Sequence, residues 1–333
     1  MLEDHANSYL PFLGADSLRQ AAATLVSRLS GAHYDWNNST IVRASGLDGI
    51  LNDLLALLEP GDEVLLTDPI YIGLVNRVRL AGGVPAFAPY NIKDGAWRLD
   101  HDQLRQTVTS KTKVFLLMSP SMPRGAVFSH RDWEAVCTAC QEADAWLLYE
   151  SAMERILFDK PEQIHPASSP GMAESTISVG AVSNEYRMIG WRIGWIVAPP
   201  SIIDDIGLVS ISNVVCPVGI AQAAATVALH TPHSDIASAT AEWQSRRDLI
   251  VQELDSVPIG KPQGGWSMLM DVSSLGLPGA EASQRLLEKG KIAATATTGW
   301  GSERSADFIR FVSSNEPVGR LRGIRTRVEA PLQ

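Results

Sequence analysis

The sequence predicts an α/β fold in which helices cover both faces of a mostly parallel sheet. Segments rich in β-branched and aromatic residues alternate along the chain with segments of helical periodicity, which is typical of strand–helix–strand units. Residues 114–118 are apolar throughout, as expected for a strand that is buried on both faces of a parallel sheet. A length of 333 residues suits one large domain and a smaller second domain.

Local signals predict the individual elements. Asp16 or Ser17 can cap a first helix that runs to about Leu29. A Pro-Gly turn at 60–61 precedes the apolar residues Val64, Leu65 and Leu66, and the stretch that leads to Pro69 reads as a buried strand. We expect further strands at 39–43, 83–90, 114–118, 145–149, 176–179, 193–197, 262–272 and 308–313, and helices that end at 58 and 230 or span 104–110, 131–143 and 234–254.

The composition excludes several kinds of partner. A net charge of −9 argues against nucleic acid and anionic membranes. No apolar run reaches the roughly 18 residues of a membrane-spanning helix, and the acidic start of the chain predicts no secretion signal. The three cysteines Cys137, Cys140 and Cys216 are few and odd in number, which favours a reducing, cytoplasmic location. Because Cys137 and Cys140 fall in a predicted helix without a His/Cys cluster, we expect no metal site.

One stretch indicates the type of α/β fold. Residues 183–194, SNEYRMIGWRIG, resemble the lysine segment of class I/II aminotransferases, which reads S-K-x-Y-x-M-x-G-W-R-x-G. Those aspartate-aminotransferase-like proteins have fold type I and depend on pyridoxal phosphate (PLP). The resemblance extends from Tyr9 to Ser313. It implies a short N-terminal arm at 1–14, a large domain at 15–231 with a mostly parallel seven-stranded sheet, and a small α/β C-terminal domain at 232–333.

Several positions of the family's binding sites keep suitable residues. Tyr71 occupies the position whose ring stacks on the pyridine ring of PLP, and Glu150 that of the aspartate that pairs with the pyridine nitrogen. Arg192 occupies the position of the phosphate-binding arginine, and Arg310 that of the arginine that holds the substrate carboxylate. Tyr9 has the place of a tyrosine that reaches the cofactor phosphate of the neighbouring subunit, so the resemblance implies a homodimer.

Other positions of the same sites have changed. Asn184 occupies the position of the lysine that forms the Schiff base with PLP, and an amide nitrogen cannot form an imine. Met122 and Met153 replace an asparagine and a tyrosine that contact the ring hydroxyl of PLP. Leu47 or Asp48, depending on the register, replaces a hydroxyl side chain at the phosphate. Because these changes surround one ligand, we expect no PLP and no other cofactor.

The remaining constellation leaves three functions open. The first is a PLP-independent enzyme, plausible in a biosynthetic pathway, that cyclises, eliminates from or isomerises a small carboxylate-bearing metabolite. In it Glu150 would be the base, and the donors to a developing oxyanion would be Tyr71, Tyr186 and Asn184. The substrate-binding residues would be Arg310, Arg192, Tyr9, Trp266, Met122, Met153 and Asp48. The second function is an aminotransferase that binds PLP non-covalently, and the third is an inactive homologue that acts as a ligand sensor or partner subunit.

Overall fold

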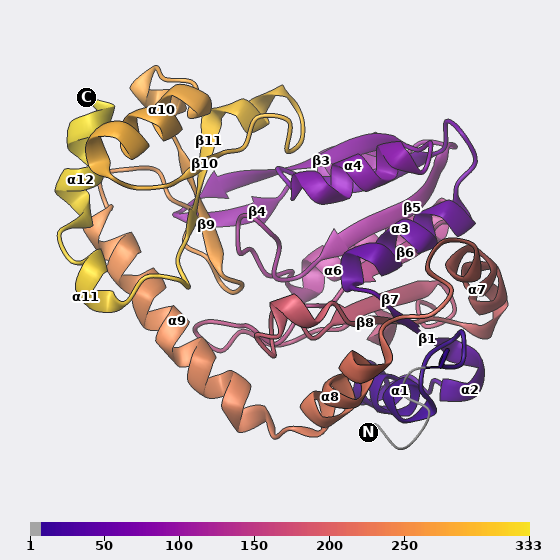
Figure 1. Ribbon diagram of the computed structural model, residues 1–333. Helices are drawn as coiled ribbons and strands as arrows, with labels where there is room; N and C mark the ends of the chain where they lie inside the picture. Colours follow the sequence, from indigo (N-terminus) through magenta and orange to yellow (C-terminus); the bar gives the residue numbers. More distant parts are fainter. Residues whose placement is uncertain (1–7) are drawn as a thin grey trace.

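A mixed sheet of eight strands is the largest feature of the computed structural model, which describes residues 8–333 (Figure 1). The strands lie in the order β1-β8-β7-β6-β5-β2-β3-β4. The four neighbouring pairs from β7 to β3 are parallel, and the three outer pairs are antiparallel. The strands are β1 (Thr40–Arg43), β2 (Glu63–Asp68), β3 (Val84–Lys93), β4 (Ala96–Leu99), β5 (Thr112–Met118), β6 (Trp146–Glu150), β7 (Thr176–Ala181) and β8 (Gly194–Val197).

Alternate side chains of these strands build one apolar layer on each face of the sheet. In β2, Val64 and Leu66 join one core and Leu65 joins the other, because successive side chains of a strand point to opposite faces. The first core is covered by α3 (Gly46–Leu57), α4 (Ile72–Leu80) and α7 (Pro200–Val214). The second face is covered by α5 (His101–Thr107), α6 (His130–Glu142), α1 (Asp16–Ser30) and α8 (Gly219–His230), while α2 (Trp36–Ser39) is a single turn before β1.

A second, smaller sheet forms in the C-terminal third of the chain. The long helix α9 (His233–Glu253) leads to it from α8 (Figure 1). Its three antiparallel strands lie in the order β10-β11-β9, and its core includes Ile250 of α9 and Leu254 directly after this helix. The elements are β9 (Ser267–Asp271), β10 (Thr295–Ala296), β11 (Phe308–Val312), α10 (Gly279–Arg285), α11 (Val318–Leu321) and α12 (Ile324–Leu332).

The predicted α/β fold with a mostly parallel sheet is confirmed, while the number of strands and several element bounds differ; the strand expected at 262–272, for example, is β9 and spans Ser267–Asp271. The large sheet has eight strands where seven were expected, because β4 pairs with the end of β3 as a hairpin. Asp94 and Gly95 connect the two strands with φ of 52° and 71°, and Asp-Gly is a favoured sequence for such a turn. The helix expected at 104–110 spans His101–Thr107, since the side chain of Asp100 caps it by accepting from the backbone N–H of Gln103.

Other predictions are not decided by the fold. Residues 1–7 of the expected arm lie outside the described residues, and the domain boundaries stay predictions. Cys137 and Cys140 are buried in α6, the helix expected around them, while the cytoplasmic location stays a prediction. Among the described helices, none has both the length and the apolar character that crossing a membrane requires.

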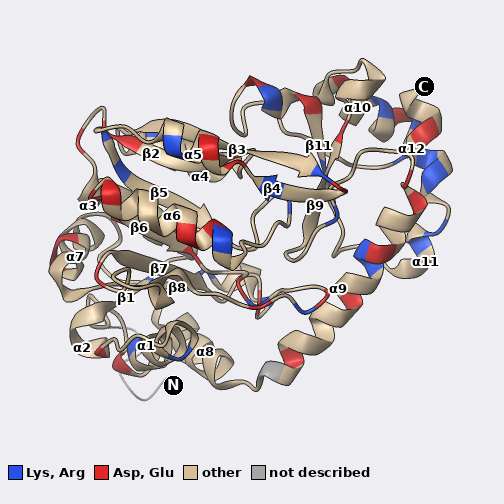
Figure 2. Cartoon of the chain, turned by 180° about the vertical axis from the view of Figure 1, so that it is seen from behind, with Lys and Arg blue, Asp and Glu red and all other residues tan. Residues whose placement is uncertain are grey.

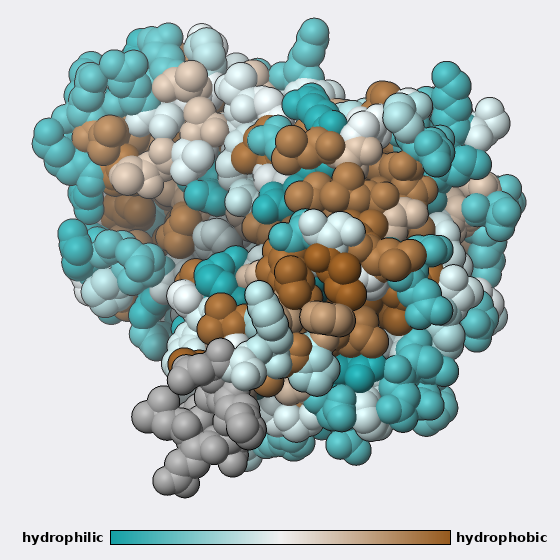
Figure 3. Space-filling model, turned by 45° about the vertical axis from the view of Figure 1, so that its right-hand side comes forward, coloured by the Kyte–Doolittle hydropathy of each residue, from teal (hydrophilic) through white to brown (hydrophobic). Residues whose placement is uncertain are grey.

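The surface is charged in some areas and apolar in others. Figure 2 shows acidic and basic residues interspersed along the helices, rather than gathered by sign. Figure 3 shows apolar side chains gathered on the face that Figure 1 has on its right, where α7 lies. Leu208 of α7 is 67% exposed. An exposed apolar area of this kind is a candidate contact surface for another protein molecule.

Candidate functional site

A cleft of about 380 Å³ lies at the carboxyl ends of the parallel strands. Its lining comes from the residues that follow β2, β5, β6 and β7, from the start of α3, and from the small sheet. Ligands of open α/β sheets bind outside the carboxyl ends of the strands, where loops from distant parts of the chain meet. The volume is that of a pocket for a small molecule.

One end of the cleft is suited to an anion. Ser45, Gly46 and Leu47 line it where α3 begins, and the free N–H groups of a first helical turn attract negative charge. Arg192 lines the cleft as well, and its guanidinium donates to the carbonyl oxygen of Ile189 at 2.8 Å. Gly194 brings this segment against α3, because a Cβ there would lie 2.6 Å from the backbone nitrogen of Gly46.

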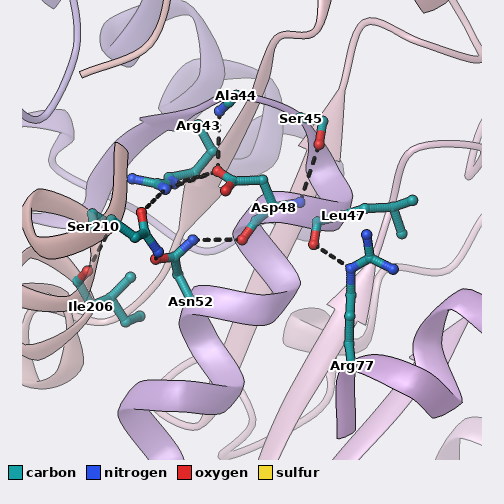
Figure 4. A network of polar contacts seen from close by, with 10 residues as sticks. Arg43, Ala44, Ser45, Leu47, Asp48, Asn52, Arg77, Ile206 and Ser210 are labelled. Atoms are coloured by element: carbon teal, nitrogen blue, oxygen red, sulfur yellow. Dashed lines mark hydrogen bonds and ion pairs between the residues drawn. The ribbon is translucent and has the colours of Figure 1, made fainter. Parts of the chain in front are cut away.

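Asp48, in contrast, points away from the cleft (Figure 4). Its Oδ2 accepts hydrogen bonds from Nε of Arg43 at 2.9 Å and from the backbone N–H of Ala44 at 3.2 Å. Arg43 is fully buried and also donates to Oδ1 of Asn213 at 3.2 Å. A buried guanidinium needs an anionic partner, and Asp48 is that partner. The assignment of Asp48 to substrate binding is therefore wrong, and its carboxylate does not oppose an anion at the start of α3.

Glu150 is the acidic group of the cleft. It ends β6, is 8% exposed, and accepts a hydrogen bond from the backbone N–H of Ala152 at 3.2 Å. Burial raises the pKa of Glu150 to about 7, with a further contribution from Glu185, while the bond from Ala152 acts in the opposite direction. A carboxyl group with this pKa can both hold and release a proton near neutral pH.

The segment that carries Asn184 is anchored by a buried ion pair. Arg155 contacts Oε2 of Glu185 through Nη2 at 2.5 Å and through Nε at 2.7 Å. Burial acts to lower the pKa of Arg155, but Glu185 and Tyr186 raise it above its ordinary value. Arg155 also donates to the hydroxyl oxygen of Tyr186 at 2.6 Å. Tyr186 packs against the core beneath α1 and α8, so its assignment as a donor in the cleft is wrong.

Arg310 of β11 lines the cleft among aromatic rings. Its guanidinium carbon lies 5.2 Å from the ring centre of Trp300 and 5.5 Å from that of Trp266. Burial lowers the pKa of Arg310, although Tyr71 acts in the opposite direction. Nη2 donates to the hydroxyl of Thr295 at 3.3 Å, and the buried Nε has no hydrogen-bond partner among the described residues. A half-buried cation with free donors is suited to an anionic group of a ligand.

Trp300 also lines the cleft, although the sequence did not predict it as a site residue. The loop 297–302 brings it there by two contacts with the end of β2. The backbone N–H of Ile70 donates to the carbonyl oxygen of Trp300 at 2.7 Å, and the hydroxyl of Ser302 donates to Oδ2 of Asp68 at 2.5 Å. A Cβ on Gly301 would lie 1.9 Å from Oδ1 of Asp68, so this approach requires glycine. The signal was the string Gly-Trp-Gly, a large aromatic residue between two glycines in a loop.

The cleft brings most of the predicted site residues together. Those that line it are Tyr71, Met122, Glu150, Met153, Asn184, Arg192, Trp266 and Arg310. Tyr9 does not line the cleft of its own chain. It is 80% exposed beside residues 216–219, and its expected place in a neighbouring subunit stays a prediction.

Comparison with known proteins gives a consistent assignment. A family model described as aminotransferase class I and II matches residues 2–315. An aspartate aminotransferase of Pyrococcus abyssi is 31% identical over 297 residues, which is 88% of this chain and 76% of the relative. Aromatic-amino-acid aminotransferase 2 of Thermococcus litoralis is 28% identical over 93% of this chain and 80% of its own. The solved structure of an aromatic aminotransferase from Pyrococcus horikoshii has a TM-score of 0.93 and 28% identity, and covers 99% of this chain and 88% of that one.

These relatives correct the expected function. They are named as aminotransferases of several specificities, so the expectation of a PLP-independent lyase, cyclase or isomerase is wrong, as is that of a protein without a cofactor. The expectation rested on the residue types at Met122, Met153 and Asn184, and the names of the relatives count against it. The arrangement of Arg192 beside a helix start, a buried carboxylate and Arg310 remains. The chain belongs to the class I and II aminotransferase family.

Proposed function

We propose that this chain transfers an amino group between an amino acid and a 2-oxo acid, with PLP held in the cleft by non-covalent contacts. The observation that supports the proposal most is one cleft that combines Arg192, Glu150 and Arg310. These groups can bind a phosphate, a ring nitrogen and a carboxylate, respectively. The relatives described above are named as aminotransferases, and their names give different amino acids as substrates.

The lining of the cleft fits PLP at three points. The N–H groups at the start of α3, together with Arg192, suit a phosphate. The ring of Tyr71 suits stacking on a pyridine ring. The buried carboxyl of Glu150 suits a hydrogen bond to the ring nitrogen. No lysine is found among the described residues that line the cleft, and the amide of Asn184 cannot replace an amine. We therefore propose binding without a covalent bond.

The chain's own residues would bind and orient the reactants. PLP, when bound, supplies the electron sink that amino-group transfer requires. Arg310 binds the substrate carboxylate through paired hydrogen bonds and so orients the bond that breaks at Cα. Glu150 holds a proton at the ring nitrogen. Asn184 can donate from Nδ2 and accept at Oδ1, so it can hold the substrate amino group. Because an amide does not exchange protons as an amine does, the proton that leaves Cα would pass to solvent water and return from it, and we expect slower turnover than with a lysine at this position.

Covalent trapping tests how PLP is bound. The purified protein is incubated with PLP, reduced with borohydride and analysed by mass spectrometry, while equilibrium dialysis with absorbance detection measures total binding. We expect binding without an adduct for the native chain, and an adduct at residue 184 for Asn184→Lys. The exposed Asn91→Lys variant is the control for unspecific reaction, since Asn91 lies outside the cleft. Absence of PLP binding by dialysis, or an adduct at one specific residue of the native chain in proportion to the bound PLP, would contradict the proposal.

We further propose that the chain forms a homodimer through an apolar patch beside the cleft. Ile189 belongs to this patch and also lines the cleft, so the patch borders the site. Large exposed apolar side chains that adjoin one another favour a contact with another protein molecule. The patch consists of Tyr9, Ile189, Trp191, Val218 and Ile220, all at least 46% exposed.

Static light scattering tests the dimer. At micromolar concentration we expect a mass of about twice the 36.0 kDa of one chain. Ile220→Glu should halve the mass, because it places a charge in the apolar patch. Leu80→Glu is the matched control, since Leu80 is 73% exposed at the end of α4, outside the patch. A single-chain mass for the native protein, or an unchanged mass for Ile220→Glu, would argue against this interface.

A further inference from the structure

The end of the cleft at Arg310 is built from three aromatic side chains. Tyr71, Trp266 and Trp300 all line the cleft. Trp300 meets Tyr71 edge to face, with 5.7 Å between ring centres and 77° between ring planes. Arg310 lies within cation–π distance of both tryptophans. The two rings therefore hold the guanidinium in place and present flat apolar surface next to it.

The remaining walls are also mainly apolar. Three thioether side chains line the cleft at Met118, Met122 and Met153. Methionine adapts to the shape of its neighbours, and its sulfur contacts aromatic ring edges favourably. Leu74 and Ile189 add aliphatic surface. Polar side chains that could pair with a second charged group of a ligand are therefore few in the cleft.

The cleft has one cation available to pair with a carboxylate of a substrate. Among the described lining residues, the basic groups are Arg192 and Arg310, and the acidic group is Glu150. Arg192 belongs to the end where α3 begins, since Gly194 packs there against Gly46. Arg310 thus remains for the substrate. A second carboxylate would be buried against apolar side chains without a cation, which is unfavourable.

We propose that the substrates are amino acids and 2-oxo acids with one carboxylate and a flat aromatic side chain. The carboxylate binds Arg310, and the aromatic group lies against Trp266 and Trp300. This inference rests on the proposed function, because it takes the cleft as an amino-acid site. It goes further by selecting one class of substrate and rejecting the dicarboxylic class. An aromatic ring gains buried area and ring contacts here, whereas an anionic side chain loses its hydration.

Equilibrium binding distinguishes the two classes without turnover. The probes are 3-phenylpropanoate, which has one carboxylate and a ring, and succinate, which has two carboxylates. Both are titrated by calorimetry into the full-length protein with PLP in excess. We expect 3-phenylpropanoate to bind at least about tenfold more tightly than succinate. Trp266→Leu and Trp300→Leu should lower this ratio several-fold. Trp36→Leu is the matched control, since Trp36 also contacts an arginine, Arg19 at 5.2 Å, but outside the cleft.

Each outcome of the titrations is decisive. A ratio below about ten for the native protein overturns the inference, including the case in which a neighbouring subunit supplies a second cation for succinate. Equal weakening of both acids in the tryptophan variants also overturns it, because the rings would then only position Arg310. A high ratio that depends on the two tryptophans supports it, even if no amino-group transfer is detected. Failure of the proposed function is thus seen in turnover, and failure of this inference in the ratio.

Discussion

The Glu150→Gln variant should lose a pH dependence of stability that the buried carboxyl group gives to the native chain. Burial raises the pKa of Glu150 from its ordinary value of 4.5 to about 7. Below pH 4.5 the group is protonated in both the folded and the unfolded chain. Between pH 4.5 and about pH 7 the unfolded chain releases the proton of Glu150 and the folded chain keeps it. The free energy of unfolding therefore decreases as pH rises through this range. Above about pH 7 the loss is complete.

The size of this effect follows from the displaced pKa. One pKa unit corresponds to about 1.4 kcal/mol, so the group lowers the free energy of unfolding by on the order of 3 kcal/mol between pH 4.5 and 8. Glutamine has nearly the same shape and no charge, so the variant lacks this loss. Glu154, whose pKa burial raises to about 8, acts in the same direction in both proteins and leaves their difference unchanged.

Urea unfolding of both proteins at pH 4.5, 6 and 8 measures the difference. We expect the variant to gain about 3 kcal/mol relative to the native chain between pH 4.5 and 8. Glu134→Gln controls for the loss of a carboxylate on the exposed side of α6. If the difference between Glu150→Gln and the native chain changes by less than about 0.5 kcal/mol over this range, burial does not shift the pKa and the argument is refuted.

Two further predictions concern the guanidinium groups of Arg310 in the cleft and of Arg155 outside it. Arg310→Ala should weaken the binding of a carboxylate ligand by about 100-fold or more, measured by calorimetry, since a buried charged contact is lost. Arg320→Ala, which removes a 73% exposed side chain paired with Glu316, should leave the affinity unchanged. Glu185→Gln should lower the free energy of unfolding by about 3–5 kcal/mol, because Arg155 then remains buried without its counter-ion. Adding Arg155→Met should recover much of that loss in urea unfolding, and equal stability of the single and double variants would contradict the pair's role.

The fold was predictable because its signals are local. The strand at 114–118 shows in the sequence as a run without polar residues, and the pairing of β5 buries that run on both faces. The eighth strand was missed although Asp94-Gly95 indicates a hairpin turn. Strand β4 has only four residues, and so short a segment carries little periodicity of its own.

The cleft was predictable where a residue follows directly from the end of a strand or belongs to a contiguous motif. Glu150 ends β6, and Tyr71 and Asn184 follow β2 and β7 within three residues, so the topology of the sheet brings them to one edge. Arg192 and Arg310 belong to short strings with a characteristic order. The residue types were also read correctly, but the absence of PLP inferred from them was wrong, because that inference gave the replaced residues more weight than the kept ones.

The amino-acid sequence by itself therefore determined the α/β architecture and the position of most cleft residues. Hydrophobic periodicity and contiguous motifs span only a few residues, so both can be recognised without the tertiary structure. Only the tertiary structure decided which of the candidate side chains point into the cleft and which point away from it. Asp48 accepts a hydrogen bond from the buried Arg43, and the hydroxyl of Tyr186 accepts one from the buried Arg155. Because both arginines lie outside the cleft, these two side chains point away from it. Trp300 enters the cleft because its loop is bonded to residues more than 200 positions earlier. Such contacts depend on distance in space, which no local pattern of residues encodes.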